Sequence, residues 1–400
     1  MNEADPIANL VLRLAELGRA HPSAPDLTRI EPFEPFFHHG NLDALHLDKR
    51  DGALTRREVL TRLLLLSAVL DQGPDILGLR EMVTRFTNEL YRREIRFLHK
   101  PILFFEELGI AIEQLLEQHE AVRKLRAGDW AAANRTNPRR YNLFMDNAHQ
   151  ALGYAVFRWG VPLALIYLLE RESDGRETVT ALLDYLESYP STEIMTQQLK
   201  DHTRYGLGKA IGDKAAHLFG KWLVTSYPLT RRTDDLAWQG LSYEVPYDSN
   251  AGRVLWRTGY LLHWASEEDY LHYQVLQPRR GKGGMTYIRV TNLRGKPLGK
   301  DRLFTAALKD AYDDVCRRHL KTHRRAPAKV EIQRIQHAYL LRLNQQHQPP
   351  FAAGHFDDGL IYVGTTFCFN HAQPDCSRCP LRDLCRGYNE TPALITAYRT

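Results

Sequence analysis

The chain has few cysteines and no long apolar run. Five of its 400 residues are cysteine, and no stretch approaches the roughly 18 apolar residues that a membrane span needs. The richest apolar stretch, 153–170, is interrupted by Arg158 and Pro162. The opening residues MNEADPIANL lack the basic and apolar regions of a secretory signal. We therefore expect a cytoplasmic protein with no membrane segment.

Strand-like runs are also scarce, and helical periodicity dominates. Apolar residues recur at three- and four-residue spacing along 55–70, where Thr55 is the expected N-cap. The same pattern predicts helices over 76–98, 101–126, 179–189, 213–227 and 330–344. The best strand candidate is 285–293. The sequence thus predicts a mainly α fold.

Positive charge is concentrated in one part of the chain. The net charge is +5, but residues 278–330 hold fifteen Lys and Arg against four Asp and Glu. Such a basic segment on a mildly acidic body suggests a polyanionic partner, and an ordinary solvated surface face is the equal alternative. We divide the chain accordingly: an N-terminal extension 1–54, a helical body 55–271, a basic insertion 272–326, and a C-terminal helix with a cysteine loop 327–400.

Four of the five cysteines lie within eighteen residues near the C-terminus. Cys368, Cys376, Cys379 and Cys385 follow the spacing C-x7-C-x2-C-x5-C. Clustered cysteines in a cytoplasmic protein more often bind metal than form disulfides. One C-x2-C turn with unequal flanking gaps favours a [4Fe–4S] cluster, and zinc is the alternative. The loop also carries Arg378 and Arg382, which could meet a DNA phosphate backbone.

The segment GLIYVGTTFC-x7-C-x2-C-x5-C resembles the C-terminal cluster loop of the endonuclease III branch of the helix-hairpin-helix (HhH-GPD) DNA glycosylases. That family has C-x6-C in the first gap, so this chain carries one additional residue. The resemblance implies a two-lobed helical fold with a [4Fe–4S] loop. It also implies a monomeric, nucleoid-associated enzyme that binds double-stranded DNA containing a damaged base.

The resemblance further implies a helical hairpin with a glycine-rich turn. The stretch YGLGKAIGDKAAHLFGKWLV supplies glycines at Gly206, Gly208 and Gly212. Backbone N–H groups of such a turn can hold a DNA phosphate without reading a base. The family's nucleophilic lysine falls on Lys214. An alternative register, prompted by Ala210 where the family has glycine, leaves Lys209 as the second choice.

Two further positions match family segments. Asp248, in VPYDSNAGRVLWRTGYL, falls on the catalytic aspartate of the family. Its position before a helix also makes it a good N-cap on physical grounds alone. Gln72 falls on a glutamine that can enter the duplex near the damaged base, although an ordinary helix end at Gly73–Pro74 is an equal alternative.

Together these residues imply a bifunctional DNA glycosylase with AP-lyase activity. Asp248 would stabilise positive charge at the sugar C1′, and a neutral Lys214 would attack that carbon to form a Schiff base. The long interval between the two residues favours an oxidised purine as substrate. Two alternatives stay open. One is a non-catalytic iron–sulfur protein that binds DNA or senses redox state. The other is a nucleoside or nucleotide N-glycosidase on the same scaffold.

Overall fold

The computed structural model of the chain is mainly helical, as the sequence predicts. It describes residues 5–30, 42–43, 45–46, 54–71, 76–109, 111–113, 150–172, 180–245, 248–263, 276–280, 286–290, 297–299, 305–322, 329–331, 334–369 and 373–396. Within these residues, no helix combines the length and apolar character that crossing a membrane requires.

The chain divides into two compact units. The central unit is Ala24–Arg232, and the terminal unit joins Met1–Ser23 to Thr233–Thr400. The terminal unit is therefore built from both ends of the sequence. The four ranges expected from the sequence divide the chain at other positions and remain predictions.

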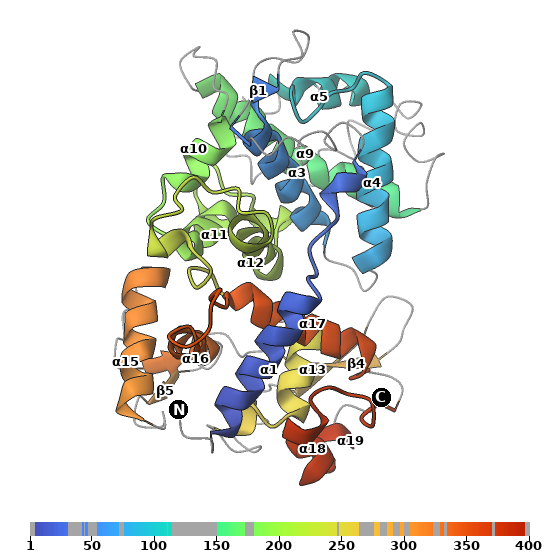
Figure 1. The fold of residues 1–400 in the computed structure, drawn as a ribbon. Coiled ribbons are helices and arrows are strands. Elements are labelled where there is room, and N and C mark those ends of the chain that lie inside the picture. The colour runs from blue at the N-terminus through green and yellow to red at the C-terminus, as the bar shows by residue number, and fades with distance from the viewer. Residues whose placement is uncertain are drawn as a thin grey trace. The chain divides into compact units, whose positions relative to one another are not determined.

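The central unit is built around one buried helix. Its elements are η1 (Leu27–Arg29), β1 (Leu45–His46), β2 (Leu54–Thr55), α3 (Arg56–Leu70), α4 (Ile76–Arg92), α5 (Ile102–Leu108), α9 (Gln150–Glu172), α10 (Ala181–Glu187), α11 (Thr192–Asp201), η3 (Gly208–Ala210), α12 (Asp213–Lys221) and the π-helical η4 (Trp222–Ser226). Helix α3 packs against α4, α9, α10 and α12 (Figure 1).

Helix α3 forms the core because it is apolar around most of its circumference. Thr55 caps it as predicted, accepting a hydrogen bond from the Glu58 N–H. Its one buried cation, Arg62, is held by Glu58 at 2.8 Å and by Glu170 of α9 at 2.7 Å. Pairing and hydrogen bonding are what make a buried arginine tolerable in a core.

The terminal unit combines helices with two small antiparallel sheets. Its elements are α1 (Pro6–Ala20), η5 (Leu236–Trp238), α13 (Ser249–Arg257), η6 (Leu261–His263), β3 (Leu276–Arg280), β4 (Thr286–Val290), β5 (Pro297–Gly299), α15 (Ala306–Asp314), the π-helical η8 (Val315–Leu320), β6 (Lys329–Glu331), α16 (Ile335–Leu343), α17 (Ala353–Thr366), η10 (Arg382–Leu384), α18 (Arg386–Asn389) and α19 (Ala393–Thr396). Strand β3 pairs with β4, and β5 pairs with β6. The predicted strand at 285–293 is confirmed by β4.

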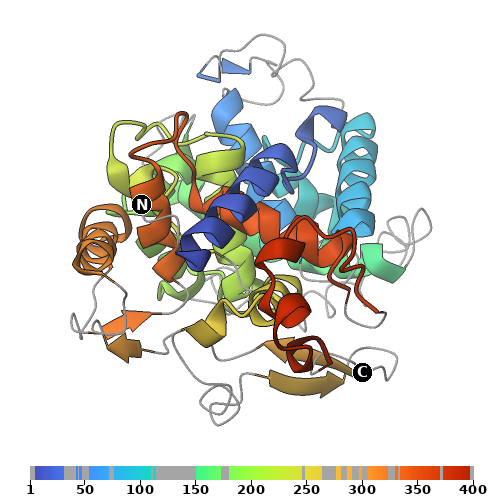
Figure 2. The ribbon, with the colours of Figure 1, turned by 60° about the horizontal axis from the view of Figure 1, so that its bottom comes forward.

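Helices α1 and α17 lie side by side and join the two ends of the sequence (Figure 2). They cross at two glycines. A Cβ atom on Gly359 would lie 2.0 Å from the Leu14 carbonyl oxygen, and one on Gly18 would lie 1.8 Å from the His355 carbonyl oxygen. Only glycine permits such close backbone approach. This crossing holds α17, which leads into the cysteine loop.

The structure corrects three predicted helices. The helix expected over 101–126 ends at Leu108, because Gly109 adopts a left-handed conformation with φ of 69° and closes the last turn. The helix expected over 76–98 ends at Arg92. Residues 330 and 331, which were expected to begin a helix, lie in strand β6 instead, paired with β5. The spacing of apolar residues is a local pattern, so it did not show that this segment pairs with β5.

Candidate functional site

The four clustered cysteines line one pocket in the terminal unit, together with residues of α13 and α17. All four are free thiols and half-buried. Cys368 directly follows α17, and its N–H donates to the Val363 carbonyl at 2.9 Å. Cys376 and Cys379 share one tight turn, with the Cys379 N–H 3.3 Å from the Cys376 carbonyl oxygen. The chain thus directs all four predicted ligands toward one space.

Burial works against charge on these thiols. It raises the pKa of Cys379 to about 12 and that of Cys385 to about 11, and it also raises the pKa of Cys376. Negative charge on the other cysteines, including Cys368, raises these values further. A bound metal reverses this preference because a ligating thiol is deprotonated by the cation. Metal binding at this site would therefore release the thiol protons.

Helix α13 holds the cysteine loop through two buried arginines. The Arg257 Nη1 lies 3.3 Å from the Cys368 Sγ and 2.8 Å from the Phe369 carbonyl oxygen, and it donates to both. Arg253 donates to the Gly364 carbonyl at 2.8 Å and also to the Cys368 carbonyl. Both arginines are 3% exposed or less. The Arg257 cation therefore lies beside the Cys368 thiol, and the Arg253 cation lies beside the loop backbone, rather than in solvent.

Asp248 caps the other end of the same helix. Its Oδ1 accepts hydrogen bonds from the Asn250 N–H at 2.8 Å and the Ala251 N–H at 2.9 Å. The predicted N-cap is confirmed. One helix therefore connects Asp248 to the cysteine loop, within the terminal unit.

The glycine-rich turn lies between α11 and α12, which pack against each other in the central unit. A Cβ atom on Gly206 would lie 2.5 Å from the His202 carbonyl oxygen, and Gly208 has a φ of 55°. Both positions therefore require glycine. Gly212, the N-cap of α12, has open space around its Cα. Lys209 lies in η3, and its side chain is outside the described part.

Lys214 is the second residue of α12, which begins where the sequence predicts. Its Nζ lies 3.9 Å from the Oδ1 of Asp71, a carboxylate at the end of α3 that is only 4% exposed. Gln72 lies outside the described residues. The sequence analysis singled out Gln72 and missed Asp71. No local pattern marks Asp71, because its neighbours Arg80 and Lys214 come from α4 and α12.

Beside Asp71 lies a cavity of about 480 Å³ in the central unit. Its wall includes Asp71, Arg80 of α4 and Trp222 of η4. Trp222, Trp238, Tyr243 and Trp256 are all buried, as expected of core aromatics. Trp222 alone among them also faces this cavity.

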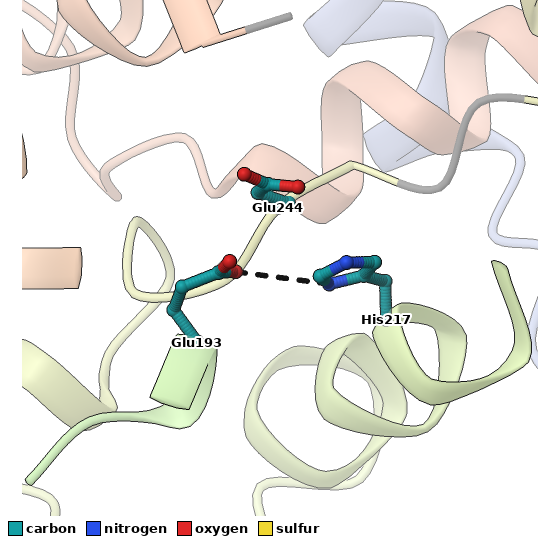
Figure 3. Close-up of side chains that lie close together, drawn as sticks. All are labelled: Glu193, His217 and Glu244. Carbon is teal, nitrogen blue, oxygen red and sulfur yellow. Dashed lines mark ion pairs between the residues drawn. The ribbon is translucent and has the colours of Figure 1, made fainter. Parts of the chain in front are cut away.

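A second polar pair joins α11 to α12. Figure 3 shows the Glu193 carboxylate facing the His217 ring, with Oε2 3.7 Å from Nδ1. Glu193 also accepts from the Gln197 amide at 2.7 Å. Glu244, drawn in the same figure, belongs to the terminal unit, where it accepts from the Arg334 Nε at 2.6 Å.

The two arginines predicted to meet phosphate extend from the cysteine loop into solvent. The Arg378 side chain is 79% exposed and lies 3.4 Å from Asp375, and Arg382 is 48% exposed and lies 3.2 Å from Asp383. Such exposed pairs hold a side chain weakly. Both arginines are accessible, and their contact with phosphate remains a prediction.

Comparison of the chain with protein-family models, with curated protein sequences and with solved structures finds no match. The functional argument therefore rests on the residues themselves. Lys214 belongs to the central unit, and Asp248 and the cysteines belong to the terminal unit.

Proposed function

We propose that the chain is a DNA N-glycosylase with AP-lyase activity that acts on a damaged base flipped out of double-stranded DNA. The observation that carries the proposal is helix α13, which has Asp248 at its N-cap and Arg257 bonded to the cysteine loop at its other end. This linkage joins the two features on which the sequence resemblance to helix-hairpin-helix glycosylases depends. An oxidised purine is the lesion we favour.

The chemistry assigns one role to each side chain. Cleavage of an N-glycosidic bond builds positive charge at C1′, which the Asp248 carboxylate would stabilise electrostatically. The neutral amine of Lys214 attacks C1′, and the base leaves with the bonding electrons and takes up a proton. After the attached nitrogen loses one proton, the C1′–O4′ bond breaks, O4′ takes up a proton, and the open sugar is left as a protonated Schiff base. Loss of a C2′ proton then breaks the C3′–O bond and nicks the strand. Asp71, 3.9 Å from Lys214, offers a carboxylate to receive the ammonium proton.

Cys368, Cys376, Cys379 and Cys385 would hold a [4Fe–4S] cluster that ties the C-terminal loop to α13. One C-x2-C turn with unequal flanking gaps supports this assignment, and zinc is the alternative.

The proposal is tested on duplexes that each carry one lesion. Wild-type protein is compared with Lys214→Gln and Asp248→Asn, and base release and strand cleavage are measured separately. We expect a lesion, an oxidised purine first, to be released by the wild type and cleavage to be lost in both variants. Cleavage that survives both substitutions would contradict the assignment.

A non-catalytic iron–sulfur DNA-binding protein is the second candidate. The ion pair between Lys214 and the buried Asp71 favours it, because a structural lysine makes the same contact. Absence of base release with every lesion, together with salt-dependent binding of undamaged duplex, would support this candidate over the enzyme.

A further inference from the structure

His202 is the C-cap of α11, and its imidazole organises the turn that follows this helix. The backbone N–H groups of Arg204 and Tyr205 both donate to its Nδ1, at 3.1 Å and 3.0 Å. A ring nitrogen accepts hydrogen bonds only through a lone pair, so Nδ1 carries no proton and the ring proton lies on Nε2. The turn therefore depends on a neutral histidine.

This turn leads directly into the glycine-rich segment. The Gly206 N–H donates to the His202 carbonyl at 3.0 Å, and the Leu207 N–H donates to the Leu199 carbonyl at 2.8 Å. Gly206 follows Tyr205, so the two N–H groups that the imidazole holds are the last ones before the glycines. The imidazole therefore fixes the conformation at the start of this segment.

Two tyrosine rings pack against the imidazole. It stacks on the Tyr205 ring with centroids 5.1 Å apart, and it lies nearly perpendicular to the Tyr185 ring of α10 with centroids 6.4 Å apart. Burial raises the pKa of both phenols, so both are uncharged near neutral pH. The imidazole itself is only half-buried, so solvent protons reach it.

The charged groups near the imidazole are largely paired with one another. Glu172, at the end of α9, accepts from the Tyr205 hydroxyl at 2.6 Å and also from Arg204. Lys200 lies 2.6 Å from Asp213. The titratable and charged groups of the surrounding segments are Glu172 of α9, Tyr185 and Tyr189 of α10, Lys200 and Asp201 of α11, and Arg204 and Tyr205 of the turn. Among the described residues, no carboxylate forms an ion pair with the imidazole, so a proton on the ring gains no salt bridge.

We infer that protonation of His202 opens this turn and makes the glycine-rich segment sensitive to pH. A protonated imidazole carries a hydrogen on Nδ1 as well, so the N–H groups of Arg204 and Tyr205 lose their acceptor. Histidine is the side chain that changes charge between about pH 5 and pH 8. The opening of the turn does not depend on the proposed function, and only its effect on a DNA phosphate held by the glycines rests on that function.

Hydrogen exchange of the full chain, measured by mass spectrometry on the peptide 203–207, tests the inference at pH 7.5 and pH 5.5. Protection factors are compared because they remove the effect of pH on intrinsic exchange. His202→Asn is the matched variant: its Oδ1 takes the place of Nδ1 as an acceptor and takes up no proton at these pH values. His202→Gln is the control, since its amide group lies one bond further from the backbone.

We expect the protection factor of the wild type to fall by about tenfold at pH 5.5, the equivalent of about one net hydrogen bond. His202→Asn should keep at both pH values the protection that the wild type has at pH 7.5, and His202→Gln should be weakly protected at both. Equal protection of the wild type at the two pH values overturns the inference, as does an equal fall in His202→Asn.

A second arm measures affinity for a duplex with an abasic site at the same two pH values and one salt concentration. The wild type should lose several-fold more affinity than His202→Asn as the pH falls, up to about tenfold. Equal losses in the two proteins, together with a turn that responds to pH, would leave the inference standing and refute the contact between the hairpin and DNA. A pH-sensitive turn in a protein that binds no duplex would likewise refute only the proposed function.

Discussion

Arg257 donates a hydrogen bond to the sulfur of Cys368, with Nη1 3.3 Å from Sγ. The two residues are 111 positions apart, and the arginine side chain is buried. A hydrogen bond from a buried cation stabilises a thiolate in a ligand position. Arg257 therefore connects the helix that Asp248 caps with the loop that we propose to hold iron.

Replacing Arg257 should weaken retention of the proposed metal centre. Arg257→Met removes the bond to Cys368 and the bond to the Phe369 carbonyl, and partners outside the ligand set typically contribute tenfold to hundredfold in metal affinity. We expect iron release to a chelator to accelerate by about that factor. Arg378→Met, in the same loop but 79% exposed, is the control and should leave release unchanged. Equal release from the two variants would refute the role of Arg257.

The two hairpin glycines Gly206 and Gly212 should respond differently to alanine. A Cβ atom at 206 would press against the backbone of His202, so Gly206→Ala should lower the free energy of unfolding by about 2 kcal/mol. A Cβ atom at 212 would meet open space, and Gly212 has an ordinary φ of −87°. Gly212→Ala should therefore lower the free energy of unfolding by less than about 1 kcal/mol. Urea denaturation of both variants measures the difference, and a larger loss at 212 would contradict the hairpin geometry.

The hairpin illustrates how far sequence alone could lead. Thr55, Asp248 and the start of α12 were predictable because capping and periodicity act between residues close in the chain. The same holds for the cysteine spacing. Arg257 was not identified, because its partner is 111 residues away and no local pattern encodes such a contact. Asp71 was missed for the same reason, since its neighbours Arg80 and Lys214 come from α4 and α12.

His337 should make the terminal unit sensitive to acid. Burial lowers the pKa of this fully buried histidine from 6.5 to about 4, with Arg334 and His319 lowering it further and Glu244 and the Tyr243 carbonyl opposing. The folded protein therefore binds this proton less tightly than the unfolded chain does. The neutral ring makes its full contribution to the free energy of unfolding above about pH 6.5. This contribution, about 3 kcal/mol, is lost as the pH falls from 6.5 through 4.

Chemical unfolding of wild type and His337→Gln at pH 7 and at pH 4.5 measures this effect. The variant lacks the titrating ring, so its stability should decrease less between the two pH values than that of the wild type. Parallel decreases in the two proteins would show that other groups account for the acid sensitivity.

Substitutions of Asp248 separate its capping role from its proposed catalytic role. Asparagine is as good an N-cap as aspartate, so Asp248→Asn should keep the free energy of unfolding within about 0.5 kcal/mol, whereas Asp248→Ala should lose about 1 kcal/mol. If the carboxylate stabilises positive charge at C1′, the rate of base release should fall by about a hundredfold or more in both variants. Base release by Asp248→Asn at a rate close to that of the wild type would show that Asp248 acts only as a helix cap.

Trapping with borohydride tests the central claim most directly. Reduction converts a Schiff base between a lysine and C1′ into a stable protein–DNA adduct, which denaturing electrophoresis resolves. With duplex containing an abasic site, wild type and Lys209→Gln should yield the adduct, and Lys214→Gln should yield none. An adduct that persists in Lys214→Gln, or its absence from the wild type, would contradict the assignment of Lys214 as the nucleophile.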